Sequence, residues 1–350
     1  MRKHYLDNIR SITILLVVIF HVFFFFNPLL YTTGRVDKVI SFPSLYQSFV
    51  YPWFMALLFL VSGIASSYSL KKRDCKTFIK ERAKKTLMPS VVSVLLFGWI
   101  SGSIATTRAT SEVATLPSVV KYIIYTLSGI QGLWFLQVLF VNCLILILIK
   151  KLDKADKISQ LGAKTNLLVI LTLFFITYLM GFVLNGKVVL SYRMGFYLSY
   201  FLIGYYVLSS DKVEAILMKF WPLFLVLGLV GYGFYLPPTF TKYYGGLAVL
   251  ERFDTNLFAY FFSLALLGFF AKYCNKTNKV LGFANKVSFG VYVLHIPLIL
   301  VINELLTRYA SLSLPLTYLI LLITALPLSV GLYLLIHKVK GLRFIMFGEN

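Results

Sequence analysis

The sequence predicts an all-α, polytopic membrane protein with about ten transmembrane helices and with both termini in the cytoplasm. Three observations lead to this fold class. The 350 residues are 59% hydrophobic and only 13% charged, with a mean hydropathy of +0.82, and a soluble chain of this length could not bury so much apolar surface. The apolar residues form runs of about 20, the length that crosses a bilayer as a helix. The basic residues gather in short clusters between these runs.

Each span is predicted from this length criterion, in order along the chain and to within a few residues at its ends. The first span follows a basic N-terminus like a signal sequence, but its apolar run is too long and no small-residue cleavage site follows it. The apolar segment 119–129 is too short to span and is expected to lie at the interface, and the sixth span is also short. The ten spans lie near residues 9–30, 47–70, 89–106, 133–150, 166–186, 194–208, 220–236, 256–273, 286–307 and 316–337.

Lysine and arginine place the N-terminus in the cytoplasm. With that orientation, 25 of the 34 basic residues fall on the cytoplasmic side, in agreement with the positive-inside rule. The even number of spans returns the C-terminus to the same side. We find no internal repeat, soluble domain or low-complexity tail, so residues 1–350 are predicted to form a single integral-membrane domain.

Charge and cysteine content exclude several classes of protein. The net charge of +21 is spread over short loops rather than one soluble face, so no nucleic-acid partner is expected. Cys75, Cys143 and Cys274 are far apart and lack metal-ligand spacing, so neither a disulfide framework nor a metal site is predicted. The basic loop 71–88 is interpreted as an anchor on anionic membrane lipids; a cationic rim for a nucleotide phosphate is the less favoured alternative.

A stripe of polar residues on the first span is the strongest functional signal. Around a helix axis, Arg10 lies within about 20° of His21, and Asp7 lies within about 40° of His21. His21 lies about 16 Å along the axis from Arg10, near the middle of a bilayer. Ionisable groups at that depth are rare, so we favour a functional role over that of a packing histidine.

A second histidine is predicted at a similar depth. Ser288, Tyr292 and His295 have spacings of four and three residues, so they share one face of the ninth span. His295 lies about 13 Å from the cytoplasmic end of that span. The two histidines either form one site or pack separately, and the sequence leaves both interpretations open.

Two further residues each have a structural and a functional interpretation. Trp134 opens the fourth span, where a tryptophan is usually an interfacial anchor. Arg193 precedes the sixth span and is either an outer-face charge or a group that faces an extracytoplasmic cavity.

Five short motifs follow one another along the chain. They are Arg10 with His21; Tyr51-Pro52-Trp53-Phe54-Met55; Phe78, Arg82 and Pro89; Leu133-Trp134-Phe135-Leu136; and Ser288, Tyr292 and His295. Together they resemble the type-three family of integral-membrane acyltransferases, which make bacterial O-acyl modifications of glycans, over essentially the whole chain. The family often has a second arginine where this chain has Lys85, which lacks the bidentate fork.

The resemblance implies an acyl-CoA donor, usually acetyl-CoA, from the cytoplasm, and a hydroxyl of a glycan or lipid-linked sugar as acceptor. The chain would then be a multi-pass O-acyltransferase of the bacterial cytoplasmic membrane that transfers acyl groups other than amino-acyl groups, with no bound cofactor. The implied site residues fall into three groups: catalytic His21, Asp7 and His295; donor-binding Arg10, Arg82 and Lys85; and surrounding Trp134, Ser288, Tyr292 and Arg193.

These residue types suit ester formation. Desolvation disfavours charged histidine, so a buried imidazole stays able to take the proton of an attacking hydroxyl. Asp7 can orient Arg10, three residues on, and Ser288, Tyr292 and His295 are candidate donors to the thioester oxyanion. The alternative function is a polytopic transporter or flippase for a lipid-linked saccharide, which would also keep polar groups near the midplane. The repeated halves typical of such transporters are not found in the sequence.

Overall fold

The chain divides into two compact units in the computed structural model, which describes residues 3–25, 41–106, 113, 115–188, 191–240, 247–310 and 312–349. The first unit comprises Met1–Thr13, Ser48–Arg82 and Gln137–Asn285. The second comprises Ile14–Gln47, Ala83–Leu136 and Lys286–Asn350. The assignment of residues 1–350 to a single domain stays a prediction.

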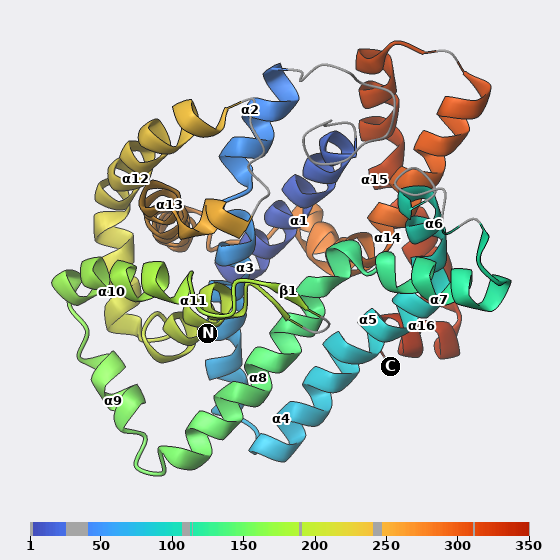
Figure 1. The fold of residues 1–350 in the computed structure, drawn as a ribbon. Coiled ribbons are helices and arrows are strands. Elements are labelled where there is room, and N and C mark those ends of the chain that lie inside the picture. Colours follow the sequence, from blue (N-terminus) through green and yellow to red (C-terminus); the bar gives the residue numbers. More distant parts are fainter. Residues whose placement is uncertain are drawn as a thin grey trace. The chain divides into compact units, whose positions relative to one another are not determined.

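Helices form nearly all of the described chain (Figure 1). The α-helices are α1 (His4–Phe24), α2 (Ser41–Val50), α3 (Phe54–Leu70), α4 (Cys75–Arg82), α5 (Met88–Ser93), α6 (Trp99–Thr106), α7 (Ser118–Ser128), α8 (Trp134–Leu152), α9 (Lys157–Ala163), α10 (Leu167–Met180), α11 (Met194–Tyr206), α12 (Asp211–Thr239), α13 (Phe253–Tyr273), α14 (Lys279–Tyr309), α15 (Leu314–Lys338) and α16 (Lys340–Phe347). Shorter segments are the π-helical η1 (Ala83–Leu87) and η2 (Val94–Gly98) and the 3-10 helices η4 (Gln131–Leu133) and η5 (Leu247–Glu251). The described strands are β1 (Lys187–Val188) and β2 (Ser191–Tyr192), which pair antiparallel.

The all-α, polytopic fold class is confirmed. Among the described residues, eight helical stretches are long and apolar enough to cross a membrane. They are His4–Phe24, Phe42–Leu70, Cys75–Ile104, Gln131–Leu152, Asp211–Thr239, Phe253–Tyr273, Lys279–Tyr309 and Leu314–Lys338. The part of the predicted first span beyond residue 25 lies outside the described residues.

Two of the ten predicted spans correspond to shorter helices. Helix α10 has 14 residues and α11 has 13, whereas a straight crossing needs about 20. Between these two helices the backbone turns at Leu184 and at Arg193, where the φ angles are 49° and 48°. The predicted count of about ten spans is therefore approximate.

The basic segment 71–88, whose apolar positions fit a helix, is largely helical. Helix α4 continues through η1 into α5, and the stretch remains helical to Ile104. Pro89 explains the π-helical turn that precedes it, because proline has no N–H for the carbonyl of Lys85 and its ring crowds that carbonyl. A wider turn accommodates the proline without ending the helix.

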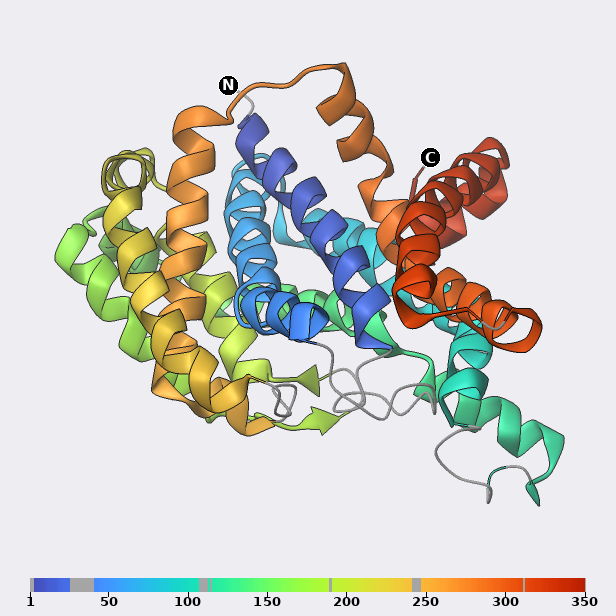
Figure 2. The same ribbon diagram turned by 90° about the horizontal axis from the view of Figure 1, so that it is seen from above.

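In the first unit, two pairs of helices form much of the core. Helix α3 lies against α11, and α12 lies along α13 (Figures 1 and 2). A Cβ on Gly63 would overlap the carbonyl oxygen of Phe201, and a Cβ on Gly204 would overlap that of Leu60. The two glycines therefore allow α3 and α11 to approach backbone to backbone, as small residues do between membrane helices.

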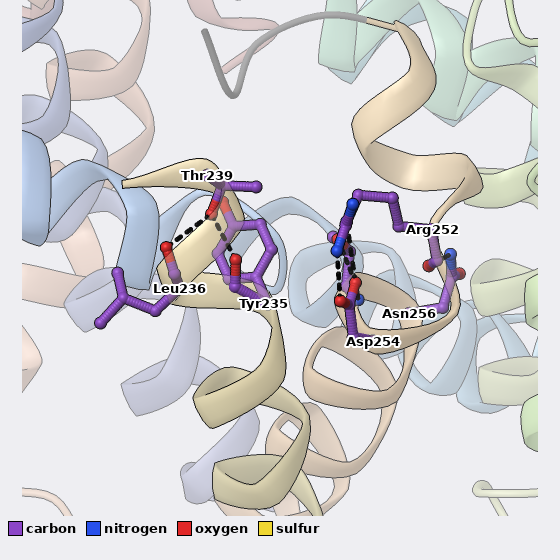
Figure 3. A network of polar contacts seen from close by, with 7 residues as sticks. Tyr235, Leu236, Thr239, Arg252, Asp254 and Asn256 are labelled. Atoms are coloured by element: carbon purple, nitrogen blue, oxygen red, sulfur yellow. Dashed lines mark hydrogen bonds and ion pairs between the residues drawn. The ribbon is translucent and has the colours of Figure 1, made fainter. Parts of the chain in front are cut away.

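Polar side chains fix the end of α12 and the start of α13 (Figure 3). Thr239 Oγ1 donates to a carbonyl one turn earlier at 2.5 Å. Arg252 Nε donates to Asp254 Oδ1 at 3.0 Å, and Asn256 Nδ2 donates to the carbonyl of Leu250 at 2.6 Å. Because helix ends carry backbone groups without helical partners, such contacts stabilise the start of α13.

In the second unit, α6 lies against α7, and α16 lies against α5. The ring of Tyr333 on α15 fills the space beside Gly290 on α14, where a Cβ would overlap it. Tyr333 Oη donates to Glu349 at 3.3 Å, and Glu349 Oε2 lies 3.1 Å from His337 Nε2. These contacts hold residue 349 against α15.

Candidate functional site

Two histidines lie in direct contact in the second unit. His21 belongs to the C-terminal part of α1, and His295 belongs to the middle of α14. His295 Nε2 lies 3.1 Å from His21 Nδ1, and the ring centroids are 5.0 Å apart. His295 is 1% exposed, whereas His21 is partly exposed. The structure therefore places the two histidines at one site rather than at separate packing positions.

The hydrogen-bond partners of these rings indicate their tautomers. His295 Nδ1 lies 2.7 Å from the carbonyl oxygen of Tyr292, so this nitrogen carries the proton and Nε2 is an acceptor. His21 Nδ1 lies 2.9 Å from the carbonyl oxygen of Val17 and 3.1 Å from His295 Nε2, so it donates to both. The lone pair of His21 is therefore on Nε2, which makes no hydrogen bond within the described chain.

A proline interrupts the hydrogen-bond ladder of α14 two residues after His295. Pro297 has no N–H, so the carbonyl of Val293 loses its helical partner. Val293, Ile296 and Pro297 line a cavity of about 10 Å³, which is room for roughly one water molecule. The cavity thus lies at the break in the backbone ladder, one turn from the histidine.

The opposite wall of this cavity is the η4 turn that precedes α8. Tyr292 Oη donates to the carbonyl oxygen of Gly132. A Cβ on Gly132 would lie 3.8 Å from His21 Cε1, and Tyr292 packs edge-on against Phe135 with ring centroids 6.0 Å apart. The η4 turn therefore lies beside the histidine pair.

Gln131, in this turn, is a candidate that the sequence did not single out. Its φ angle is 31°, a conformation that residues other than glycine rarely adopt. Its Oε1 is buried without a hydrogen-bond partner among the described residues, and the side chain lines the cavity. Ser93 is 1% exposed and lines the same cavity with an Oγ that also lacks a partner there. The available sequence signal was weak: a glutamine between two glycines just before a span.

Asp7, Arg10 and Arg82 belong to the first unit. Arg10 NH1 lies 3.2 Å from Asp7 Oδ1, the pairing that their spacing suggests, and the Arg10 side chain remains 41% exposed. The guanidinium carbon of Arg82 lies 5.0 Å from the centroid of the Phe78 ring on the same helix. A half-exposed pair of this kind contributes only about 0–1 kcal/mol to stability.

Arg193, also in the first unit, is 0% exposed. Its guanidinium carbon lies 5.6 Å from the centroid of the Tyr51 ring and 5.2 Å from that of Tyr192. Aromatic faces stabilise a cation by their quadrupole. Arg193 is therefore a buried cation enclosed by tyrosines and not a solvent-exposed charge.

The remaining predicted residues belong to the second unit. Lys85 is exposed in η1, and Ser288 is buried on α14 one turn before Tyr292. Trp134 begins α8, is partly exposed, and packs edge-on against Phe135 with centroids 6.4 Å apart. Within the part of the chain that the structure describes, no group of three or more histidine, cysteine, aspartate or glutamate side chains is placed to hold a metal ion.

Comparison with known proteins agrees with the motifs. A family model described as "Acyltransferase domain" matches residues 3–334, nearly the whole chain. No curated protein and no solved structure matches. Every candidate residue of both units lies inside the matched range.

Proposed function

Because this chain belongs to the type-three acyltransferase family, whose members transfer acyl groups at membranes, we propose that it moves an acetyl group from cytoplasmic acetyl-CoA to a glycan hydroxyl. The acceptor is a glycan or lipid-linked sugar at the bacterial cytoplasmic membrane. The observation that carries the proposal is the contact between His21 and His295, in which His21 Nε2 makes no hydrogen bond to the residues that the structure describes. An imidazole lone pair that is open to a substrate suits proton removal from an alcohol.

In the proposed reaction, His21 Nε2 takes the proton of the acceptor hydroxyl while the hydroxyl oxygen attacks the thioester carbon. The carbon–sulfur bond then breaks, and the coenzyme A thiolate leaves with the proton that His21 held. Alcohol and thioester become ester and thiol, so no further reactant is needed. A positioned general base of this kind contributes roughly 10²–10⁴ in rate.

His295 is assigned a positioning role. Its Nε2 accepts from His21 Nδ1, which holds the His21 ring with Nε2 free. When His21 takes a proton, its Nδ1–H becomes a charged donor, and hydrogen bonds from charged donors are roughly twice as strong as neutral ones. His295 thus stabilises the protonated base.

The cavity beside the η4 turn contains two polar atoms that lack partners within the described residues, Gln131 Oε1 and Ser93 Oγ. The single water molecule for which the cavity has room would satisfy them and hold the turn in place. Tyr292 already donates to Gly132, so its proposed role is to hold the η4 turn beside His21 rather than to bind the oxyanion.

Arg10, Arg82 and Lys85 are proposed to bind the donor phosphates. Arginine forks bind phosphate oxygens in pairs, and the Arg10 side chain is 41% exposed. Asp7 orients Arg10 through the 3.2 Å ion pair.

Incorporation of label from acetyl-CoA into a glycan by the purified protein in nanodiscs tests the proposal. Mass spectrometry of cell-surface and lipid-linked glycans, from cells with and without the protein, identifies the acceptor. Label that enters glycan only when the protein is present supports acyl transfer. Movement of a lipid-linked sugar across the membrane without any label transfer would favour a flippase instead.

A further inference from the structure

A short segment of the second unit, residues 340–349, contacts the π-helical turn η1. We call it the docking segment. Helix α16 makes up most of it and lies against α5, the helix that follows η1 (Figure 1). The η1 turn carries Lys84 and Lys85, and Lys85 is one of the residues proposed to bind the donor phosphates. The docking segment is therefore in a position to act on the proposed donor site.

Gly348 brings the docking segment onto the backbone of η1. A Cβ on Gly348 would overlap the carbonyl oxygen of Lys84 and would lie 3.1 Å from the Cα of Lys85. The φ angle of Gly348 is 64°, in the left-handed region that glycine adopts without strain. Glycine is thus required here for two reasons: for the turn that ends α16 and for the space beside the Lys84–Lys85 peptide.

Side chains hold the docking segment on both sides. On the side of η1, Lys84 Nζ lies 4.7 Å from the centroid of the Phe344 ring. On the side of α15, the ring of Phe347 is buried with its centroid 5.0 Å from that of Tyr333, and Tyr333 Oη donates to Glu349 at 3.3 Å. The docking segment thus connects η1 to a membrane-spanning helix of the same unit.

The backbone of η1 benefits from an external contact. Pro89 follows it and has no N–H to donate to the carbonyls of the preceding turn. Single π-helical turns are rare, and they occur frequently at functional sites. A backbone that is already ordered loses less conformational entropy when a ligand binds, so a preordered site binds more tightly.

We propose that Gly348 is a positioning residue for the acyl-CoA donor. Its contact with η1 fixes the Lys84–Lys85 peptide, so that the Lys85 ammonium group is presented to a phosphate of the donor. This inference rests on the proposed function, which assigns the donor phosphates in part to Lys85. A lysine is a point charge on a flexible stem, so the order of the backbone that carries it affects its binding. Gly348 acts through Lys85 and is assigned no contact with the donor.

Binding of a non-hydrolysable acyl-CoA to the purified full chain tests this role. Gly348→Ala should weaken binding by about tenfold and raise the KM for acetyl-CoA similarly, with kcat nearly unchanged, because it displaces Lys85 and not the histidine pair. Gly341→Ala on the same helix is the matched control, because a Cβ there meets nothing within 4 Å. Equal donor affinities for the two variants would overturn the proposal.

A variant at the other end of the docking segment takes the place of Gly348→Ala if that variant does not fold. Glu349→Ala removes the acceptor of the Tyr333 hydrogen bond and should also weaken donor binding. Glu349→Gln is its control, because an amide oxygen still accepts that hydrogen bond and should restore most of the affinity. Equal affinities for these two variants would contradict the role of the docking segment.

A double-mutant cycle separates positioning from a general loss of stability. Lys85→Gln alone should weaken donor binding, since it removes the charge. Gly348→Ala added to Lys85→Gln should weaken binding further by less than about twofold, because no ammonium group is left to misplace. Fully additive effects would show that Gly348 acts on the fold rather than on Lys85.

Hydrogen–deuterium exchange without ligand provides a measurement that does not depend on acyl transfer. Gly348→Ala should speed exchange in the peptide that covers residues 83–88, and Gly341→Ala should not. Unchanged exchange in Gly348→Ala would overturn the inference and leave the acyl-transfer proposal intact, since wild-type label transfer tests the latter. A wild-type chain in which exchange shows the contact but which binds no acyl-CoA would overturn the proposed donor, and the positioning role with it.

Discussion

The two histidines touch, but their nitrogens are not equivalent. His295 uses Nδ1 to donate to the carbonyl of Tyr292 and Nε2 to accept from His21. His21 uses only Nδ1 within the described chain, so its Nε2 is open to a substrate. A proton acceptor needs an open lone pair, and for this reason we propose that role for His21.

His21→Gln is expected to slow acyl transfer by roughly 10²–10⁴-fold, because glutamine keeps a hydrogen bond but cannot take a proton near neutral pH. His21→Ala should fail to the same extent, with donor affinity roughly intact. The measurement is turnover by purified protein in nanodiscs with saturating acyl-CoA and a defined acceptor. Wild-type turnover by His21→Gln would leave His21 as a packing residue.

Substitutions at Gln131 separate its side chain from its backbone. Gln131→Ala removes the amide, and Gln131→Gly also relieves the positive φ angle, which glycine adopts freely. If the amide binds a reactant, both variants should lose about tenfold in kcat/KM. The glycine variant should melt at the higher temperature of the two. Activity that returns in Gln131→Gly but not in Gln131→Ala would show that only the backbone matters.

Substitutions of Arg10 test the proposed donor site. Arg10→Ala should weaken acyl-CoA binding by tenfold or more, because a hydrogen bond from a charged group contributes about 1.5–3 kcal/mol. Arg10→Lys should lose less, because it keeps the charge but not the fork. Isothermal titration with a non-hydrolysable acyl-CoA measures both. Unchanged affinity in Arg10→Ala would shift the phosphate contacts to Arg82 and Lys85.

At the scale of whole elements, the sequence predicted where helices lie better than how long they are. An apolar run of about 20 residues identifies a span, and α8 follows its run closely, whereas α1 and α14 begin several residues before the predicted spans. The sixth span, 194–208, was predicted to be short and agrees with α11, whereas the run at 166–186 is longer than α10. The turn between them depends on backbone angles at Leu184 and Arg193, which hydropathy does not encode.

The candidate site was also predictable only in part. The periodicity of α14 put Tyr292 and His295 on one face, and the depths of His21 and His295 agreed. Their contact was not predictable, because it depends on which helices adjoin. The cavity residue Gln131 carried no periodic signal, since its importance comes from a single backbone angle and an unpartnered amide.

The packing of α3 on α11 is tested by a matched pair of glycines. Gly204→Ala should destabilise the protein by about 1–3 kcal/mol, because its Cβ would meet the backbone carbonyl of Leu60, which cannot rotate away. Gly233→Ala, on α12, meets nothing within 4 Å and should be neutral or stabilising by up to about 1 kcal/mol. Thermal unfolding in detergent compares the two. Equal melting temperatures would mean that α3 and α11 do not pack in this way.

At the scale of the whole molecule, orientation in the membrane comes from the sequence alone. The excess of basic residues assigns 71–88, 151–165, 209–219 and 274–286 to the cytoplasm. In the first unit, the structure brings the ends of α3, α8 and α11 and the start of α12 around one cavity, as expected of helix ends on one side of a bilayer. The donor side follows from this orientation.

The natural cysteines allow a direct test of that orientation. Cys75 and Cys274 are partly exposed and lie in segments assigned to the cytoplasm, whereas Cys143 is buried and should not react. A membrane-impermeant maleimide should therefore label the unmodified chain only after the cells are permeabilised, and peptide mass spectrometry should find the label at Cys75 and Cys274. The control is Tyr309→Cys, at the highly exposed end of α14, where the orientation predicts an extracytoplasmic position. This variant should react in intact cells. Labelling of Cys75 or Cys274 in intact cells would reverse the orientation, and a cytoplasmic acyl-CoA donor would then no longer reach the side on which Arg10 and Arg82 lie.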